Sequence, residues 1–294
     1  MTQQKTPGQR FRQAVLSEKP LQIVGTINAY CARMAKLSGH RAIYLSGAGV
    51  ANASLGLPDL GMTDLHDVLI DAARITDNVD LPLLVDIDTG WGSTLNIART
   101  IRQMIKASVA AVHIEDQVSE KRCGHRLGKQ LVSVDVMKDR IKAAVDARTD
   151  PHFVIMARTD AIQGEGINGA LDRVAQYIEV GADMLFIEAV TELTHYRLFT
   201  QNQPVPVMAN ITEFGVTPLF TLAQLQSVEV SMVLYPLSAF RAMNQAASNV
   251  YQTLRQQGTQ REILHSMQTR AALYENLDYE DYEKKMLNLK KMDI

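Results

Sequence analysis

Two stretches decide the fold of this 294-residue chain: Leu81–Asp88, which is LPLLVDID, and Ala110–Asp116, which is AAVHIED. Each is a short apolar run that ends in acidic residues, as a strand buried in a parallel sheet often does. Six other runs share this character and complete a predicted set of eight strands: Gln22–Asn28, Ala42–Gly47, Phe153–Asp160, Met184–Ala189, Val205–Thr212 and Val230–Pro236.

Segments with helical apolar spacing alternate with these strands. Thr94–Ala107 is one, and Ile167–Val180 is another that stops at Gly181, a suitable helix terminator. Alternation of eight strands with helices predicts an α/β fold, a (β/α)₈ barrel of the TIM type. A doubly wound open sheet is the alternative, but it usually has fewer strands, and no G-x-G-x-x-G follows a strand here. Further helices are expected at Thr6–Glu18, Ala29–Ser38, Ala239–Gln257 and Gln260–Ile294.

Composition fits one soluble domain. We expect a single barrel over residues 1–294, with C-terminal helices from about residue 258. Hydrophobic residues make up 46% and charged residues 21%, as is ordinary for a soluble globular protein. The net charge is −2, and no basic stripe in the sequence indicates binding to nucleic acid. The apolar runs fall far short of the ~20 residues that a membrane span needs. Met1–Arg10 is polar and lacks an apolar signal core, so we expect a cytoplasmic protein.

Polar residues recur where the predicted strands end. In a barrel these ends meet at one rim, where the active site lies. Strand ends are also polar simply because they approach solvent, but here acidic groups and an arginine are embedded in apolar runs, where they are costly unless paired or bound to metal. The residues at these ends are Ser46, Gly47, Asp86, Asp88, Glu115, Asp116, Arg158, Asp160, Glu188, Asn210 and Thr212.

Asp86 and Asp88 are two residues apart on one strand, so their side chains share a face. Two carboxylates this close repel each other unless a cation or a proton lies between them. With Glu115 on the next strand they form an all-oxygen ligand set, which favours Mg²⁺ or Mn²⁺ over zinc. A carboxylate pair that performs acid/base chemistry without metal is the alternative.

The long polar loop Gln117–Val132 contains Lys121–Arg126, which is KRCGHR. Four potentially cationic residues surround Cys123, and they would stabilise a thiolate and attract an anionic substrate. Glycines in the loop suggest a movable lid. An exposed basic loop with an incidental cysteine is the alternative, and the C-x-H pair alone is weak evidence for a metal site. The other cysteine, Cys31, lies in a predicted helix and is expected to be packed, without a disulfide.

Lys121–His125 resembles the K-[KR]-C-G-H signature of the isocitrate lyase/phosphoenolpyruvate mutase superfamily, and the resemblance covers nearly the whole chain. Met267–Arg270 and the lack of a large insertion are most similar to the 2-methylisocitrate lyases, because isocitrate lyases are longer and the phosphonomutases lack the cysteine signature. Other matching stretches are Ile43–Gly47, Leu57–Asp59, His113–Gln117, Ala157–Asp160, Asn210–Glu213 and Tyr235–Ser238.

The resemblance implies a carbon–carbon lyase of the methylcitrate cycle that cleaves the tricarboxylate 2-methylisocitrate to pyruvate and succinate. An oxaloacetate hydrolase, a dimethylmalate lyase and a non-catalytic carboxylate-binding protein are the alternatives. The resemblance also implies a homotetramer with a swapped eighth helix. The implied cofactor is Mg²⁺, with Mn²⁺ as a substitute. The departures from the family pattern are Ile87, Trp91 and Ile187, which put the exact substrate preference in doubt.

The resemblance further implies a role for each matching residue. Asp86 and Asp88 would hold the metal, with Asp59 and Glu115 around its water shell. Cys123 would be the acid, with Lys121 and His125 beside it. Tyr44 is the candidate base, and a metal-linked carboxylate is the alternative. Phe186 and Leu234 would face the substrate methyl group. The remaining substrate-binding residues would be Ser46, Gly47, Ala48, Gly124, Arg158, Glu188, Asn210, Ile211, Thr212, Arg241 and Arg270.

Overall fold

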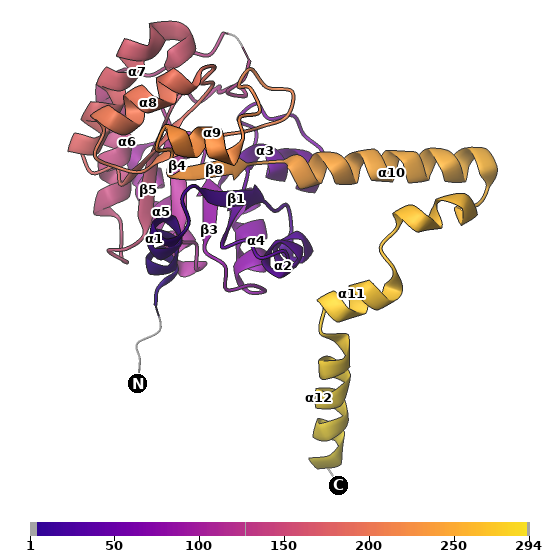
Figure 1. Cartoon of the computed structure of the whole chain (residues 1–294). Helices are drawn as coiled ribbons and strands as arrows, with labels where there is room; N and C mark the ends of the chain where they lie inside the picture. Colours follow the sequence, from indigo (N-terminus) through magenta and orange to yellow (C-terminus); the bar gives the residue numbers. More distant parts are fainter. Residues whose placement is uncertain (1–4, 127, 293–294) are drawn as a thin grey trace. The chain divides into compact units, whose positions relative to one another are not determined.

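Eight parallel strands close into a barrel in the order β1 to β8, with β1 paired to β8 (Figure 1). The computed structural model describes residues 5–126 and 128–292. The predicted TIM-type barrel is therefore confirmed. The strands are β1 (Leu21–Gly25), β2 (Ala42–Leu45), β3 (Leu83–Asp86), β4 (Ala111–Glu115), β5 (Val154–Thr159), β6 (Met184–Ile187), β7 (Val207–Asn210) and β8 (Met232–Tyr235).

Each predicted strand overlaps an observed one, and β1 begins one residue before its prediction, but the predictions run too far at the carboxyl end. Ala42–Gly47 was predicted and β2 stops at Leu45, because Gly47 already begins the next helical turn. Leu81–Asp88 was predicted and β3 stops at Asp86, after which Asp88 takes a positive φ of 48°. The extra residues belong to the rim of the barrel and turn away from the sheet.

Helices surround the strands, as the alternating pattern predicts. α5 buries Ile97, Ile101 and Met104 on one face, which is the expected amphipathic stripe. α7 contains Gly166 in a non-helical conformation (φ 72°, ψ −178°), which explains why the sequence pattern begins only at the following residue. The helices of the barrel are α1 (Pro7–Ser17), α2 (Ala29–Leu37), α3 (Gly47–Gly49), the π-helical turn η1 (Val50–Ser54), α4 (Leu65–Thr76), α5 (Thr94–Lys106), α6 (Val134–Asp146), α7 (Ile162–Glu179), α8 (Leu193–Asn202) and α9 (Leu222–Ser227).

Two apolar clusters make up the core. The outer cluster fills the space between sheet and helices and includes residues from α4 to α9. The inner cluster fills the barrel with alternate strand residues such as Leu84, Met156 and Met208, and it includes Phe11 from α1. Phe11 is fully buried, so α1 packs against the amino-terminal end of the barrel interior and leaves the carboxyl end for the site.

The chain divides into two compact units, Met1–Phe240 and Arg241–Ile294. The division falls inside α10 (Ser238–Gln257), a helix that agrees with the predicted Ala239–Gln257. The predicted helix Gln260–Ile294 is divided into η2 (Arg261–Ser266), α11 (Arg270–Asn276) and α12 (Tyr279–Met292), and its last two residues lie outside the described part. Among the described residues, no helix has both the length and the apolar character that a bilayer crossing requires.

Candidate active site

The period of two along each strand brings polar groups together at the carboxyl end of the barrel. Interior positions are apolar near the amino end and become polar at the last residue of the strand or next to it. Parallel register then aligns these positions, for example Glu115 with Arg158 and Arg158 with Phe186. The polar positions are Asp86 after Leu84, Glu115 after His113, Arg158 after Met156, Glu188 after Phe186 and Asn210 after Met208.

The carboxylates of Asp86 and Asp88 converge on Gly47. A Cβ atom at residue 47 would lie 3.0 Å from Asp88 Oδ1 and 3.1 Å from Asp86 Oδ2, so only glycine leaves this space open. Asp86 accepts backbone hydrogen bonds from Gly47 (3.1 Å) and Asp88 (3.0 Å). Both carboxylates are almost fully buried. The end of β3 and the turn after it therefore bring two carboxylates side by side.

The two carboxylates differ in how readily they ionise. Burial opposes ionisation of Asp86, but His113 in its protonated form, Lys121 and Arg158 outweigh burial and hold the pKa of Asp86 below its ordinary value. Burial raises the pKa of Asp88 to about 6; Lys121 opposes this rise and Asp86 adds to it. The pair thus has one firmly ionised member and one that ionises only near neutral pH, as expected for two close carboxylates.

Lys121 lies inside the site and not on the loop surface. Its Nζ is 2.5 Å from Asp88 Oδ1 and 2.7 Å from Asp59 Oδ1, and its side chain is 4% exposed. Burial alone would lower the pKa of Lys121, but Asp88 and the other carboxylates raise it well above its ordinary value. The ammonium is therefore charged, and it balances the carboxylates that the resemblance assigns to a metal and its water shell.

The donor chemistry of this end fits Mg²⁺. All donors are hard oxygens, and neither carboxylate oxygen of the buried Glu115 has a hydrogen-bond partner among the described residues. Burial raises the pKa of Glu115 well above its ordinary value, against Arg158 and Lys121. Within residues 5–126 and 128–292, no three His, Cys, Asp or Glu side chains gather to complete a metal site alone. Asp86 and Asp88 would thus hold the ion together with water or substrate, which is usual for Mg²⁺.

Arg158 is the cationic centre of the other half of the site. Its guanidinium contacts Asp160 (3.0 Å), Glu115 (3.3 Å) and Glu188 (3.7 Å), and its Cζ lies 5.0 Å from the ring centre of Phe186. The side chain is 9% exposed. Burial disfavours the charge, but the surrounding carboxylates raise the pKa of Arg158 well above its ordinary value. A permanent, nearly desolvated cation of this kind suits a carboxylate substrate.

His125 connects the polar loop to this half. Its Nδ1 accepts a hydrogen bond from the backbone N–H of Val216 (3.2 Å), so the proton of a neutral ring lies on Nε2, which is 2.8 Å from Glu188 Oε1. Glu188 also accepts from the Asn210 amide at 3.2 Å. Burial opposes ionisation of Glu188, but Arg158 and the His125 hydrogen bond lower its pKa, so it is a carboxylate.

These pairings change the interpretation of the KRCGHR loop. Cys123 is exposed, as a reactive thiol must be. However, Lys121 points to Asp88, and His125 Nε2 lies 2.8 Å from Glu188 Oε1. Both residues of the expected cationic shell thus have buried carboxylate partners at the strand ends, and these carboxylates compete with the thiol for them. Gly124 is buried, and a Cβ there would lie 2.5 Å from Arg158 Nη2.

Tyr44 is neutral in this structure. Its hydroxyl is 2.9 Å from His113 Nε2 and 3.4 Å from Asp86 Oδ2. Burial, with Asp86, raises the pKa of Tyr44 well above its ordinary value. Burial also lowers the pKa of His113 to about 4, so the imidazole is uncharged. The tyrosinate that a base would require is therefore costly here, which favours the carboxylate alternative.

The other expected residues divide by location. Phe186 and Leu234 are buried in the inner cluster, on the interior face where a substrate methyl could meet them. Ile87 and Ile187 belong to the outer cluster between sheet and helices, so these two departures from the family pattern do not line the interior. Ser46, Ile211 and Thr212 are buried at the ends of β2 and β7, Ala48 is half-buried, and Arg241 and Arg270 belong to the second unit.

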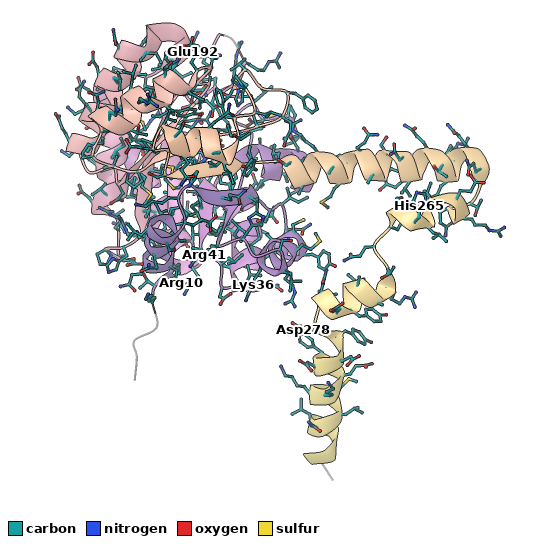
Figure 2. All side chains as sticks on the ribbon, viewed as in Figure 1. Arg10, Lys36, Arg41, Glu192, His265 and Asp278 are labelled. Carbon is teal, nitrogen blue, oxygen red and sulfur yellow. The ribbon has the colours of Figure 1, made fainter. Side chains whose placement is uncertain are left out.

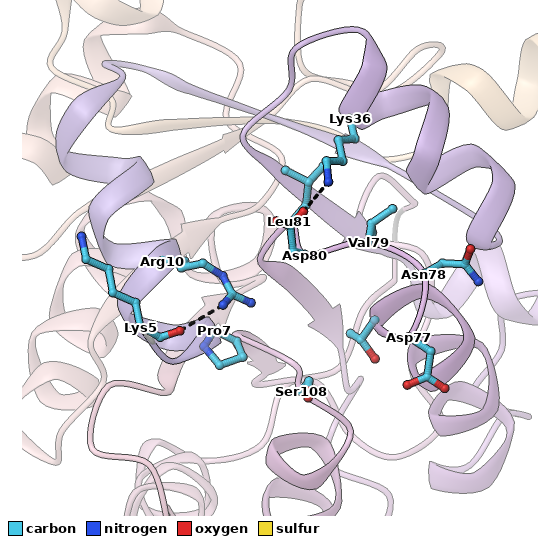
Figure 3. A pocket seen from close by; sticks show the side chains of 11 residues that line it. Lys5, Pro7, Arg10, Lys36, Asp77, Asn78, Val79, Asp80, Leu81 and Ser108 are labelled. Carbon is cyan, nitrogen blue, oxygen red and sulfur yellow. Dashed lines mark hydrogen bonds and ion pairs between the residues drawn. The ribbon is translucent and has the colours of Figure 1, made fainter. Parts of the chain in front are cut away.

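The opposite end of the barrel has a hollow of its own. A cavity of about 550 Å³ lies beside the residues that precede β3 and β4, and Leu81 and Ser108 line it (Figure 3). Two of its charged groups have partners: Lys36 Nζ is 2.6 Å from Asp80, and Arg10 donates to a backbone carbonyl. Figure 2 labels Arg10 and Lys36 at this end and Glu192, after β6, at the other. The predicted site residues of the barrel therefore lie away from this cavity.

Sequence reasoning missed two residues of the site. His113 lies fully buried between Tyr44 and Phe186, with its ring 5.1 Å from the Phe186 ring, and its place two residues before Glu115 could have indicated an interior position. Lys129 binds Asp160 at 2.9 Å, and nothing in the local pattern distinguishes it from a surface lysine.

Known proteins share this architecture and sequence. Residues 11–255 match the family described as phosphoenolpyruvate phosphomutase. A 2-methylisocitrate lyase of Vibrio cholerae is 61% identical over 287 residues, which cover 96% of this chain and 93% of the relative. The crystal structure of 2,3-dimethylmalate lyase has a TM-score of 0.88 at 31% identity, with 96% of this chain and 95% of that chain covered. Phosphonopyruvate hydrolase in complex with oxalate and Mg²⁺ has a TM-score of 0.83 at 28% identity, with coverages of 95% and 98%. The chain therefore belongs to the phosphoenolpyruvate mutase/isocitrate lyase superfamily and, within it, to the 2-methylisocitrate lyase family.

Proposed function

We propose that this enzyme cleaves 2-methylisocitrate to pyruvate and succinate, with Mg²⁺ held by Asp86 and Asp88. The observation that carries the proposal is that one rim gathers a buried carboxylate pair, a permanent cation in Arg158 and the exposed thiol of Cys123. The identity of 61% to a 2-methylisocitrate lyase supports the substrate, and the oxalate and Mg²⁺ complex of phosphonopyruvate hydrolase supports the metal.

The reaction begins with loss of the proton from the substrate hydroxyl. The carbon–carbon bond then breaks as the carbonyl of pyruvate forms, and the electron pair moves onto the succinate fragment as an aci-carboxylate. A bound Mg²⁺ would supply Lewis-acid polarisation of the hydroxyl and its neighbouring carboxylate. Because Tyr44 is neutral, we assign the base to a carboxylate beside the metal.

Cys123 then protonates the carbanionic carbon of the succinate fragment and is left as a thiolate. Arg158, with Ser46, Gly47 and Ala48, would hold the pyruvate-forming end. The charge of Arg158 would stabilise the alkoxide that forms at this end when the substrate hydroxyl loses its proton, and loss of one such donor typically costs about 10²–10³ in rate. The substrate groups of the other fragment would be bound by Gly124, Glu188, Asn210, Ile211 and Thr212. Lys121 and His125 would support the site by their ion pair and hydrogen bond to Asp88 and Glu188.

The proposed assembly is a cytoplasmic homotetramer with α10 exchanged between subunits. All residues of α10 are described, and none of its 20 residues is buried within the chain. Tyr251 and Leu254 on this helix are exposed apolar side chains. A helix of this kind is expected to pack against another subunit, and sedimentation velocity of the purified protein tests the tetramer directly.

The test of the activity is product identification. The purified enzyme is incubated with racemic 2-methylisocitrate, and pyruvate and succinate are quantified separately. We expect equal amounts of both products, loss of both after EDTA treatment, and recovery with Mg²⁺ or Mn²⁺. Pyruvate without succinate, or full activity after metal removal, would contradict the proposal.

A further inference from the structure

The loop that carries the thiol is fixed on both sides of Cys123. On one side, Gln117 Oε1 accepts from the backbone N–H of Arg122 (3.0 Å), and Gln117 Nε2 donates to the carbonyl of Arg122 (2.9 Å). On the other side, Lys129 Nζ donates to the carbonyl of Gly124 at 2.6 Å. The exposed thiol therefore stands on a short piece of backbone whose two flanking residues are held by buried or half-buried side chains.

Lys129 also fastens this loop to the barrel. Its Nζ is 2.9 Å from Asp160 Oδ1, and the two side chains are 3% and 0% exposed. Asp160 in turn binds the Arg158 guanidinium at 3.0 Å, and its backbone N–H donates to Asp116. The Lys129 ammonium thus joins Gly124, the residue next to Cys123, to Asp160. Asp160 in turn binds Arg158.

The packing of Gly124 makes this link sensitive to small movements. A Cβ at Gly124 would lie 2.5 Å from both Arg158 Nη2 and Glu188 Cγ, so the loop backbone is already in close contact with these side chains. A shift of the Gly124 carbonyl would therefore move Cys123 relative to Arg158 and Glu188. Displacement of a reacting group by about 1 Å can cost 10²-fold in rate.

We propose that Lys129 is a positioning residue, whose ammonium holds the Gly124 carbonyl against Asp160 and so sets the place of the Cys123 thiol. The inference rests on the proposed role of Cys123 as proton donor. Lys129 acts through the loop backbone and the buried carboxylate. A cation is needed there because Asp160 is fully buried and Arg158 is shared with Glu115 and Glu188.

The experiment compares Lys129→Met with wild-type enzyme and with Lys142→Met, which changes an exposed lysine of α6. Two readouts are taken on the intact protein: steady-state kinetics with 2-methylisocitrate, and the rate at which iodoacetamide alkylates Cys123, followed by mass spectrometry. For Lys129→Met we expect kcat to fall about 10- to 100-fold while KM changes less than about threefold. The alkylation rate should change by at least about threefold, since the surroundings of the thiol change.

Lys142→Met should match wild type in both readouts, and Lys129→Arg, which keeps the charge, should recover part of the lost kcat. A Lys129→Met enzyme with kcat within about twofold of wild type, or with reduced kcat but an unchanged alkylation rate, would overturn the proposal. If Lys129→Met does not fold, Lys129→Gln is measured with the same two readouts and criteria. A wild-type enzyme without pyruvate release would refute the proposed function, whereas the alkylation comparison would still decide the role of Lys129.

Discussion

Replacement of Asp88 by asparagine should stabilise the metal-free protein while it destroys the metal site. Asp88 is 2% exposed, and burial raises its pKa from 3.8 to about 6. A carboxyl group with a raised pKa binds its proton more tightly in the folded state, so stability falls as pH rises from about 4 through 6. The rise corresponds to about 3 kcal/mol above pH 6. Asparagine has the shape of the neutral acid and avoids this cost.

The expected effect is large enough to measure by thermal unfolding. About 3 kcal/mol corresponds to an increase in Tm of roughly 5–10 °C for a protein of this size, and the increase should vanish near pH 4, where the wild-type carboxyl group is protonated. Calorimetry of EDTA-treated wild type and Asp88→Asn at pH 4 and pH 8, at equal protein concentration, tests both points. Saturating Mg²⁺ should raise the Tm of wild type, by about 2.7 kcal/mol of stability at 100 times Kd, and not that of the variant.

Two results would refute this reasoning. If Asp88→Asn were less stable than wild type at pH 8 without metal, the Lys121–Asp88 ion pair would outweigh burial of the carboxylate. If Mg²⁺ raised the Tm of both proteins equally, the ion would bind elsewhere. Asp77→Asn, at an exposed residue after α4, is the matched control and should change neither Tm nor the response to Mg²⁺.

Three further predictions concern the thiol, the base and the methyl pocket. Cys123→Ser should lower kcat by at least about 10²-fold, whereas Cys31→Ser should stay near wild type because this thiol is buried; inactivation by iodoacetamide through Cys31 would contradict this. Tyr44→Phe should cost less than about 10²-fold in kcat if a carboxylate is the base, and a larger loss with an altered pH profile would return that role to the phenol. Phe186→Trp with Leu234→Thr should reduce kcat/KM for 2-methylisocitrate more than for isocitrate, by at most roughly 200-fold, and an equal reduction for both substrates would remove the methyl contact from these residues.

The sequence was sufficient for the barrel because most strands are buried on both faces and therefore appear as continuous apolar runs. The sequence was also sufficient to predict the polar residues at the rim. The period of two places Asp86 and Arg158 on the interior face, each two residues after an apolar interior residue. The strand ends were set one to three residues too late, by two in β2, because polar residues at the rim continue the pattern after the sheet has ended.

The side chains of the thiol loop could not be paired from sequence. Lys121 and Lys129 both occur in a basic loop, yet each ends in a buried ion pair with a carboxylate from a distant strand. From local composition, both lysines would be predicted to be solvated cations. Only the folded path of the loop over β3 and β5 brings them to Asp88 and Asp160. His125 is similar, because its ring contacts Glu188 and the backbone N–H of Val216, which is 91 residues away.

The most direct test of the account is the ratio of kcat/KM for 2-methylisocitrate to that for isocitrate, 2,3-dimethylmalate and oxaloacetate, measured with the Mg²⁺-loaded wild-type enzyme. The account predicts that 2-methylisocitrate has the highest value, by about 10- to 200-fold over isocitrate, because a methyl contact with Phe186 and Leu234 supplies no more than this. A higher kcat/KM for any of the other three compounds would contradict the proposed substrate.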